Sequence, residues 1–264
     1  MEQPFGRERE RDEDEEPAED FHVRPERRPR ILAGDGSPAG WYGDGVSVLS
    51  TSWPSAAEEL ANTVTHGLGA VLFAAGAAVL ITLAALRGDV WVVVSCSVFA
   101  ACLVLFYTVS TLYHAFRGPR VKGIFRRLDH AAIFLVIAGS YTPFLLVSLR
   151  GAWGWSLFGV VWTLAVLGIV FKSLWTGKLP VLSTALYLVM GWCIVVAWRP
   201  LTAAVAPAGV AWLVAGGVIY SAGVAFYALD RRFRWAHPVW HVFVLAGSAC
   251  HFVAVLLYVV PGRA

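Results

Sequence analysis

The sequence is poor in charged residues. Aspartate, glutamate, lysine and arginine make up 15% of its 264 residues, whereas a soluble domain carries about 25%. Hydrophobic residues make up 58%, and the mean hydropathy is +0.63. This composition argues against a free-standing soluble globule and predicts an integral membrane protein.

Cysteine is scarce as well. The four cysteines lie in apolar stretches and form no CxxC pair: Cys96, Cys102, Cys193 and Cys250. Cysteines in such surroundings are typically small buried hydrophobic residues. The sequence therefore argues against a disulfide framework and against a thiolate metal site.

Acidic residues are rare outside the N-terminal segment. Residues 1–53 carry 13 acidic and 7 basic side chains, whereas residues 54–264 carry 5 acidic and 14 basic ones. A segment as charged as 1–53 has too little apolar surface to offset the entropy lost on ordering. We expect it to be a disordered cytoplasmic tail, with a partner-binding arm as the alternative, and we expect 54–264 to form the membrane domain.

Long apolar runs fill the membrane domain. Each is within the usual range around the roughly 20 residues that a helix needs to cross the hydrocarbon core, whereas a β-barrel would show short alternating strands. Glycines inside these runs, among them Gly139, Gly168 and Gly191, suggest close helix–helix contacts. We predict an all-α bundle of seven transmembrane helices over residues 62–86, 90–114, 130–149, 153–171, 180–198, 207–229 and 237–260.

The charges between the predicted spans are distributed unequally. Ten basic residues fall on one side of the membrane: Arg117, Arg120, Lys122, Arg126, Arg127, Lys172, Lys178, Arg231, Arg232 and Arg234. Four fall on the other: Arg87, Arg150, Arg199 and Arg263. The positive-inside rule assigns the ten to the cytoplasm. We therefore expect a multi-pass protein of the inner cell membrane with its N-terminus in the cytoplasm and its C-terminus outside, the reverse of a G-protein-coupled receptor.

Polar residues inside predicted spans are costly and commonly mark function. With this orientation, polar groups from four helices meet at the cytoplasmic leaflet. They are Glu59, Asn62 and His66 at the start of the first span, Ser110 and His114 at the end of the second, Asp129 and His130 at the start of the third, and His237 and His241 at the start of the seventh. Their agreement on one leaflet predicts a common site.

The histidines have the spacing of metal ligands. His237 and His241 lie one helical turn apart, so both imidazoles can reach one ion, and His114 supplies a third ligand. Three protein ligands and a water are typical of catalytic zinc, whereas four protein ligands are typical of structural zinc. Asp129 could orient the water, act as general base or fill the fourth position. Ser110 could hydrogen-bond a ligand or help to hold an oxyanion.

Each of these residues also has a purely structural interpretation. Asp129 could cap the third span, and Ser110 could bond its own helix. His66 could join Glu59 and Asn62 in a polar network at a helix start. His251 lies ten residues beyond His241, and we expect it to hydrogen-bond a neighbouring helix.

The same residues resemble the haemolysin III family, the bacterial branch of the progestin and adipoQ receptor group. The resemblance covers the whole membrane domain. It is carried by Glu59-x-x-Asn62-x-x-Thr65-His66-x-x-Gly69, by Ser110-Thr111-Leu112-Tyr113-His114, by Leu128-Asp129-His130 with Ala138-Gly139-Ser140-Tyr141-Thr142-Pro143-Phe144, and by His237-x-x-x-His241. It implies a seven-helix fold that holds one Zn²⁺ on His114, His237 and His241. It also implies that Asp129 is the acid beside the zinc-bound water and that Ser110 is a serine next to the site.

The resemblance leaves the function open between classes. Because the wider superfamily includes alkaline ceramidases, a zinc-dependent hydrolase of lipid amides or esters is the first hypothesis. The second is a non-catalytic sensor or regulator of membrane-lipid homeostasis with structural zinc. A cytolysin ranks lower, because we see neither a secretion signal nor an amphipathic pore-lining segment, and a transporter is disfavoured because charges do not continue across the membrane. We expect membrane lipids as substrate or ligand and no nucleic-acid partner.

Overall fold

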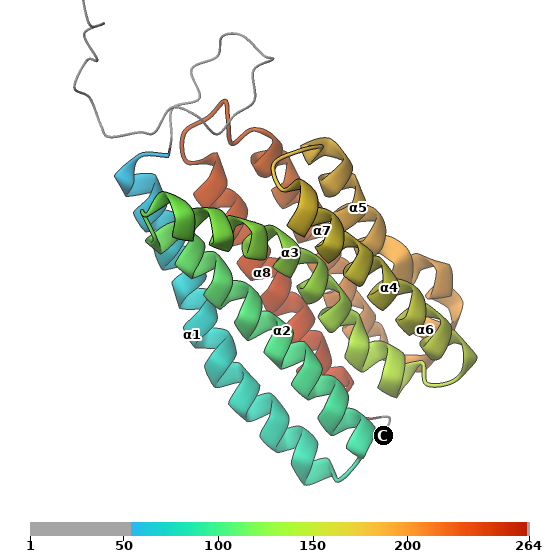
Figure 1. Ribbon diagram of the computed structural model, residues 1–264. Helices are drawn as coiled ribbons and strands as arrows, with labels where there is room; N and C mark the ends of the chain where they lie inside the picture. The colour runs from blue at the N-terminus through green and yellow to red at the C-terminus, as the bar shows by residue number, and fades with distance from the viewer. Residues whose placement is uncertain (1–53, 263–264) are drawn as a thin grey trace, which may run out of the picture. The chain divides into compact units, whose positions relative to one another are not determined.

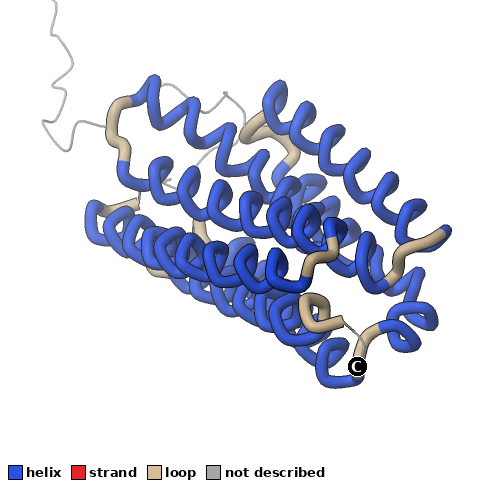
Figure 2. The backbone as a smooth tube through the Cα atoms, turned by 90° about the horizontal axis from the view of Figure 1, so that it is seen from below, coloured by secondary structure: helices blue, strands red, loops and turns tan. Residues whose placement is uncertain are grey.

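A computed structural model describes residues 54–262, and within that range the chain is helical and contains no strand (Figures 1 and 2). The predicted tail over 1–53 therefore lies outside the described residues. Seven helical segments in the described range are long and apolar enough to cross a membrane: Ala56–Arg87, Val90–Ala115, Pro119–Ser148, Ala152–Trp175, Pro180–Ala204, Pro207–Ala228 and Ala236–Tyr258. The predicted bundle of seven spanning helices is confirmed.

Two of the spans are composite. The elements in chain order are α1 (Ala56–Arg87), α2 (Val90–Ala115), α3 (Pro119–Pro143), a π-helical turn (Phe144–Ser148), α4 (Ala152–Trp175), α5 (Pro180–Trp192), a 3₁₀ turn (Cys193–Ala197), α6 (Trp198–Ala204), α7 (Pro207–Ala228) and α8 (Ala236–Tyr258). The third span is α3 with the π-helical turn, and the fifth is α5, the 3₁₀ turn and α6.

A proline lies at each interruption, and in the fifth span it accounts for the break. A proline inside a helix removes one backbone hydrogen bond and clashes with the carbonyl four residues before it. Pro143 directly precedes the π-helical turn, and Pro200 lies four residues after Val196 in the 3₁₀ turn. The Tyr141 hydroxyl, from α3, donates to the Gly191 carbonyl at 2.6 Å and accepts from the Ile194 N–H at 3.1 Å. It thereby satisfies backbone groups that a lipid environment would leave without partners.

Local sequence fixes the ends of the first helical hairpin. Ser55 and Glu58 form a reciprocal capping box at the start of α1. Gly88 ends α1 with φ +75°, a left-handed conformation that favours glycine. Asp89 then caps α2 by accepting from the Trp91 N–H at 2.8 Å. α1 and α2 therefore turn back on each other within two residues.

Glycines allow some of the helices to approach closely. A Cβ at Gly139 would lie 2.6 Å from Cys102 Cβ, and one at Gly168 would lie 2.4 Å from Phe134 Cε1. The predicted close contacts are therefore confirmed between α2 and α3 and between α3 and α4. The same prediction is wrong for Gly191, which has no neighbouring atom within 4 Å of its Cβ position, because it lines a cavity beside α5.

The start of α1 and the α2–α3, α4–α5 and α7–α8 connections lie at one end of the bundle (Figure 1). The Glu58 carboxylate joins two of them, since it accepts from the Trp235 N–H at 3.2 Å and lies 3.8 Å from Arg234 Nε. The ten basic residues assigned to one side of the membrane belong to these connections and the adjoining helix ends. They therefore gather at the end of the bundle where the polar groups were predicted to meet.

The third helix begins eleven residues before its predicted start, at Pro119 instead of 130. The added turns contain Arg120, Lys122, Arg126 and Arg127. A prediction of spans from hydropathy leaves such a charged segment out of the helix. Long basic side chains can nevertheless extend from a helix end toward the membrane surface. α3 therefore starts with a basic extension that precedes its apolar segment.

Candidate metal centre

Three histidines from two helices converge at the end of the bundle that holds the α2–α3 and α7–α8 connections. His114 comes from the last turn of α2, and His237 and His241 come from the first turns of α8. One ring nitrogen from each lies within 4.8 Å of the other two, which is a spacing that a single metal ion can bridge. His114 and His241 are buried and His237 is half-buried. The structure thus brings together all three predicted ligands.

One nitrogen of each ring is held by an oxygen atom. His114 Nδ1 lies 2.7 Å from Glu59 Oε2, and His237 Nδ1 lies 3.2 Å from Asp230 Oδ2. Carboxylates accept hydrogen bonds, so these contacts place the ring proton on Nδ1 and leave a lone pair on Nε2. Metal-binding histidines typically have such carboxylate partners.

His241 also carries its proton on Nδ1, and here a hydroxyl group is the acceptor. Its Nδ1 lies 3.2 Å from Thr65 Oγ1, and Thr65 donates its own hydrogen to the Ala61 carbonyl at 2.8 Å. The threonine oxygen therefore accepts from His241 Nδ1–H, and Nε2 again keeps a lone pair.

Two of these lone pairs are buried without a partner. Among residues 54–262, His114 Nε2 and His241 Nε2 are enclosed polar atoms with no hydrogen bond. A buried polar atom without a partner costs free energy, and its presence in a native structure requires an explanation. A metal ion bound by Nε2 of the three histidines supplies one, so the residues present fit the predicted group.

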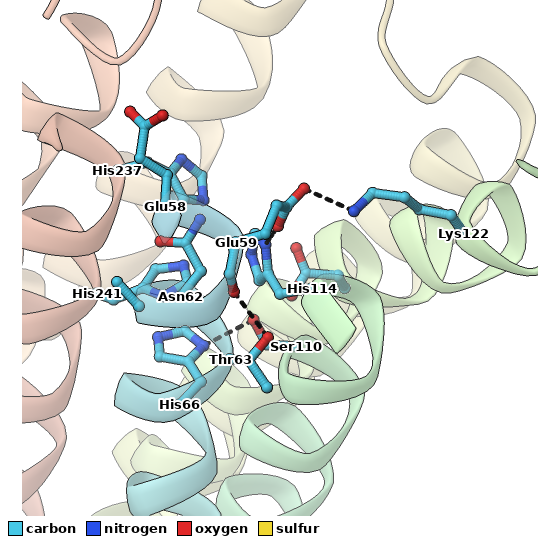
Figure 3. A network of polar contacts seen from close by, with 12 residues as sticks. Glu58, Glu59, Asn62, Thr63, His66, Ser110, His114, Lys122, His237 and His241 are labelled. Atoms are coloured by element: carbon cyan, nitrogen blue, oxygen red, sulfur yellow. Dashed lines mark hydrogen bonds and ion pairs between the residues drawn. The ribbon is translucent and has the colours of Figure 1, made fainter. Parts of the chain in front are cut away.

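The first helix supplies most of the surrounding support, as Figure 3 shows. Glu59 lies between two cationic or ionisable partners, because its second oxygen, Oε1, is 2.6 Å from Lys122 Nζ. Lys122 belongs to the basic extension of α3. The contacts of Glu59 with Lys122 and His114 therefore link α1, α2 and α3 at the site. The positive charge of Lys122 compensates the negative charge of the Glu59 carboxylate.

Sequence reasoning missed the roles of three supporting residues. The sequence suggests that Glu59 could join a polar network with Asn62 and His66, whereas in the structure its carboxylate lies 2.7 Å from His114 Nδ1. Thr65 and Asp230 had been assigned no role beside a histidine. The acidic residue in the otherwise basic α7–α8 connection was the available signal for Asp230, since few acids occur in the membrane domain.

Asp129 is buried on α3, outside the group of mutually close ligand atoms. Its carboxylate lies 3.8 Å from His130 Nδ1. Asp129 and His114 are near enough for an electrostatic interaction. This position favours a role through an intervening group over direct ligation. The alternative that Asp129 caps α3 does not hold, because α3 begins ten residues earlier at Pro119.

Ser110 contacts His66, a histidine that is not one of the three candidate metal ligands. Its Oγ lies 2.7 Å from His66 Nδ1, and both residues are buried. The His66 ring stacks on His241 with 3.6 Å between ring centroids. His66 Nε2 and the Asn62 side-chain amide are buried and have no hydrogen-bond partner within the described range. Ser110 therefore approaches the site through His66, and Asn62 and His66 add unpaired polar atoms beside it.

An apolar cavity lies among the helices, and one residue of its wall, Trp240, contacts two of the three histidines. It is enclosed by α2, α3, α5, α7 and α8, and its walls include Tyr227 and Trp240 at one end and Trp192, Gly217 and His251 at the other. The Trp240 ring contacts His237 with 4.9 Å between ring centroids. A largely apolar cavity with a few polar side chains in its wall is a typical ligand site.

A seven-span helical membrane bundle with a three-histidine cluster at one end defines the class of protein. The sequence profile of the family described as "Haemolysin-III related" matches residues 55–252. The chain belongs to the haemolysin III family.

Individual relatives agree with this assignment. The chain is 45% identical over 204 residues to "Hemolysin-3" of Bacillus cereus, which covers 77% of this chain and 93% of the relative. It is 44% identical over 203 residues to "Hemolysin-3 homolog" of Bacillus subtilis (strain 168), covering 77% and 95%. It is 29% identical over 210 residues to the human "Monocyte to macrophage differentiation factor", covering 78% and 86%. No solved structure gives a significant match.

Proposed function

We propose that this protein is a zinc-dependent hydrolase of lipid amides or esters that works at the cytoplasmic leaflet of the inner cell membrane. The observation that carries the proposal is the convergence of three anchored histidines beside an apolar cavity. Three imidazoles suit zinc, among other metals, and the cavity suits an acyl chain.

Different residues of the chain would bind the metal, orient its ligands and transfer the proton. Bound zinc would polarise a carbonyl and make water a better nucleophile near neutral pH. His114, His237 and His241 would hold it through Nε2, and Glu59, Asp230 and Thr65 would fix their ring orientation. Asp129 is the buried carboxylate at the site that we propose accepts a proton at its Oδ atoms and returns it to the leaving group.

Ser110 sets the protonation of His66 in this account. The Ser110 Oγ lies 2.7 Å from His66 Nδ1, and we propose that the hydroxyl donates to this nitrogen. The neutral imidazole then carries its proton on Nε2 and becomes a donor. Together with the unpaired Asn62 amide, His66 can stabilise negative charge that develops on a substrate oxygen. Ser110 is thus a positioning residue.

A sensor with structural zinc is the second candidate. The observation that favours it is mechanical, because the three ligands join α2 to α8, and Glu59 and Thr65 tie both to α1. In that case zinc would fix the relation of these helices and its loss would alter their packing. The two proposals differ in whether Asp129 is needed once the metal is bound.

The Asp129→Asn variant separates the two candidates. We expect it to retain zinc and to lose at least about a hundredfold in hydrolysis of a long-chain lipid amide, because the amide cannot accept the proton. Ser110→Ala should retain zinc and lose about tenfold through kcat, because His66 Nε2 no longer has a fixed proton. Zinc content by mass spectrometry and product release by chromatography provide the measurements.

Asp89→Asn is the matched control, since asparagine also caps a helix well and Asp89 lies at the opposite end of α2. It should keep both zinc and turnover. If Asp129→Asn and Asp89→Asn behave alike, with zinc bound in each, the hydrolase proposal fails and the sensor proposal remains.

A further inference from the structure

His251 is a polar residue in the wall of the apolar cavity, far from the three-histidine cluster. It lies ten residues after His241 on α8, which is about 15 Å of helix rise or roughly the length of twelve extended methylene groups. Its ring lines the main cavity and also a smaller cavity that continues toward Leu201 and Leu213. The mechanism described above does not use it.

The ring is held in one position. His251 Nε2 lies 3.3 Å from the Leu213 carbonyl on α7, which confirms the expected contact with a neighbouring helix. A Cβ at Gly216 would lie 2.4 Å from His251 Cδ2, so only glycine there leaves room for the imidazole. The Tyr220 ring packs against another edge with 5.3 Å between centroids.

These contacts determine which nitrogen is free. A carbonyl oxygen accepts, so His251 Nε2 carries the proton, and in the neutral ring Nδ1 is an acceptor. No hydrogen-bond partner of His251 Nδ1 occurs between residues 54 and 262. A residue of the cavity wall therefore carries an unpaired acceptor, in the second half of α8.

Within residues 54–262, no hydroxyl of the wall supplies the missing donor. Ser140, Thr184 and Ser221 each donate to a carbonyl of their own helix. Tyr141 donates to the Gly191 carbonyl, and Tyr220 shares a 2.7 Å hydrogen bond with Ser248. A donor for His251 must therefore come from the molecule that occupies the cavity.

We propose that the cavity selects a lipid whose acyl chain carries a hydroxyl group roughly twelve carbons from its polar end. The polar end lies beside the three histidines, where Trp240 and Tyr227 begin the cavity, and the chain hydroxyl donates to His251 Nδ1. This inference rests on the lipid-binding part of the proposed function and does not require hydrolysis.

Binding of defined fatty acids to the purified full-length protein in nanodiscs tests it. The probes are 12-hydroxyoctadecanoic acid, 6-hydroxyoctadecanoic acid and octadecanoic acid, each competing with a fluorescent fatty acid. We expect the 12-hydroxy acid to bind about five- to tenfold more tightly than the other two, as one added hydrogen bond in an apolar site allows. His251→Phe should bind all three equally, at the affinity of the plain acid.

The possible results distinguish a failure of the proposed selectivity for a chain hydroxyl from a failure of the proposed lipid binding. Equal binding of the 12-hydroxy and plain acids to the natural protein would overturn the selectivity while leaving lipid binding intact, as would occur if a water occupies the acceptor. No binding of any acid would overturn both. The comparison of the 6- and 12-hydroxy acids needs no variant, so it decides the matter even if His251→Phe does not fold.

Discussion

Single hydrogen bonds distinguish the histidines of this protein from one another. The three candidate metal ligands each donate a hydrogen bond from Nδ1 and keep a lone pair at Nε2. His66 meets the Ser110 hydroxyl at the same atom, and we propose that it keeps a proton at Nε2. Sequence alone identified these residues, because polar side chains in spans are conspicuous. It could not assign their partners, since those depend on how α1 packs between α2 and α8.

Glu59→Gln tests the anchor of His114. An amide can still hydrogen-bond the ring, but it removes the negative charge that favours the proton on Nδ1. We expect zinc affinity to fall about ten- to a hundredfold, as is typical for loss of such a partner, and a titration against a competing chelator measures it.

Glu58→Gln is the matched control for Glu59→Gln. Glutamine preserves the capping box with Ser55. Within residues 54–262, the carboxylate of Glu58 contacts Ser55, Trp235 and Arg234 and none of the three histidines. Unchanged zinc affinity in Glu59→Gln, equal to that of the control, would show that Glu59 does not support the site.

Helices carry the part of the structure that the sequence predicts well. Long apolar runs identified all seven spans, because crossing the bilayer requires length and low polarity. Hydropathy missed the basic extension of α3, which begins at Pro119. It also missed the 3₁₀ turn in the fifth span, although Pro200 was the signal for it.

Gly139→Ala tests the contact between α2 and α3. Its Cβ would meet Cys102 Cβ at 2.6 Å, so we expect a loss of about 1–3 kcal/mol in the free energy of unfolding, typical of overpacking. Denaturant titration in detergent measures this loss. Gly159→Ala is the control, because nothing lies within 4 Å of its Cβ position; equal stability of the two variants would contradict the packing described for Gly139.

In the described bundle, the ten basic residues and the three-histidine cluster lie at the same end. The connections that carry the ten basic residues lie at the same end of the bundle as the start of α1 (Figure 1). The three histidines lie at the helix ends that adjoin these connections. Side chains on the outer faces are apolar and exposed, as in Val71, Leu86 and Val181, which suits a lipid surround. We propose from the positive-inside rule that this end faces the cytoplasm.

Reporter fusions test that orientation. A phosphatase that is active only outside the cytoplasm should work when fused after Ala264, and one inserted in the Arg231–Arg234 connection should be inactive. A fluorescent protein that matures only in the cytoplasm should give the converse pattern. Activity of the phosphatase in the Arg231–Arg234 connection would place the histidine site at the outer leaflet.

The metal content of the detergent-purified protein tests the central claim most directly. Mass spectrometry should find about one zinc per chain in the natural protein and in His130→Ala, whose Nδ1 bonds the Arg126 carbonyl of its own helix. The triple variant His114→Ala, His237→Ala, His241→Ala should be folded and free of zinc. A folded natural protein without metal, or a triple variant that keeps its zinc, would contradict the account.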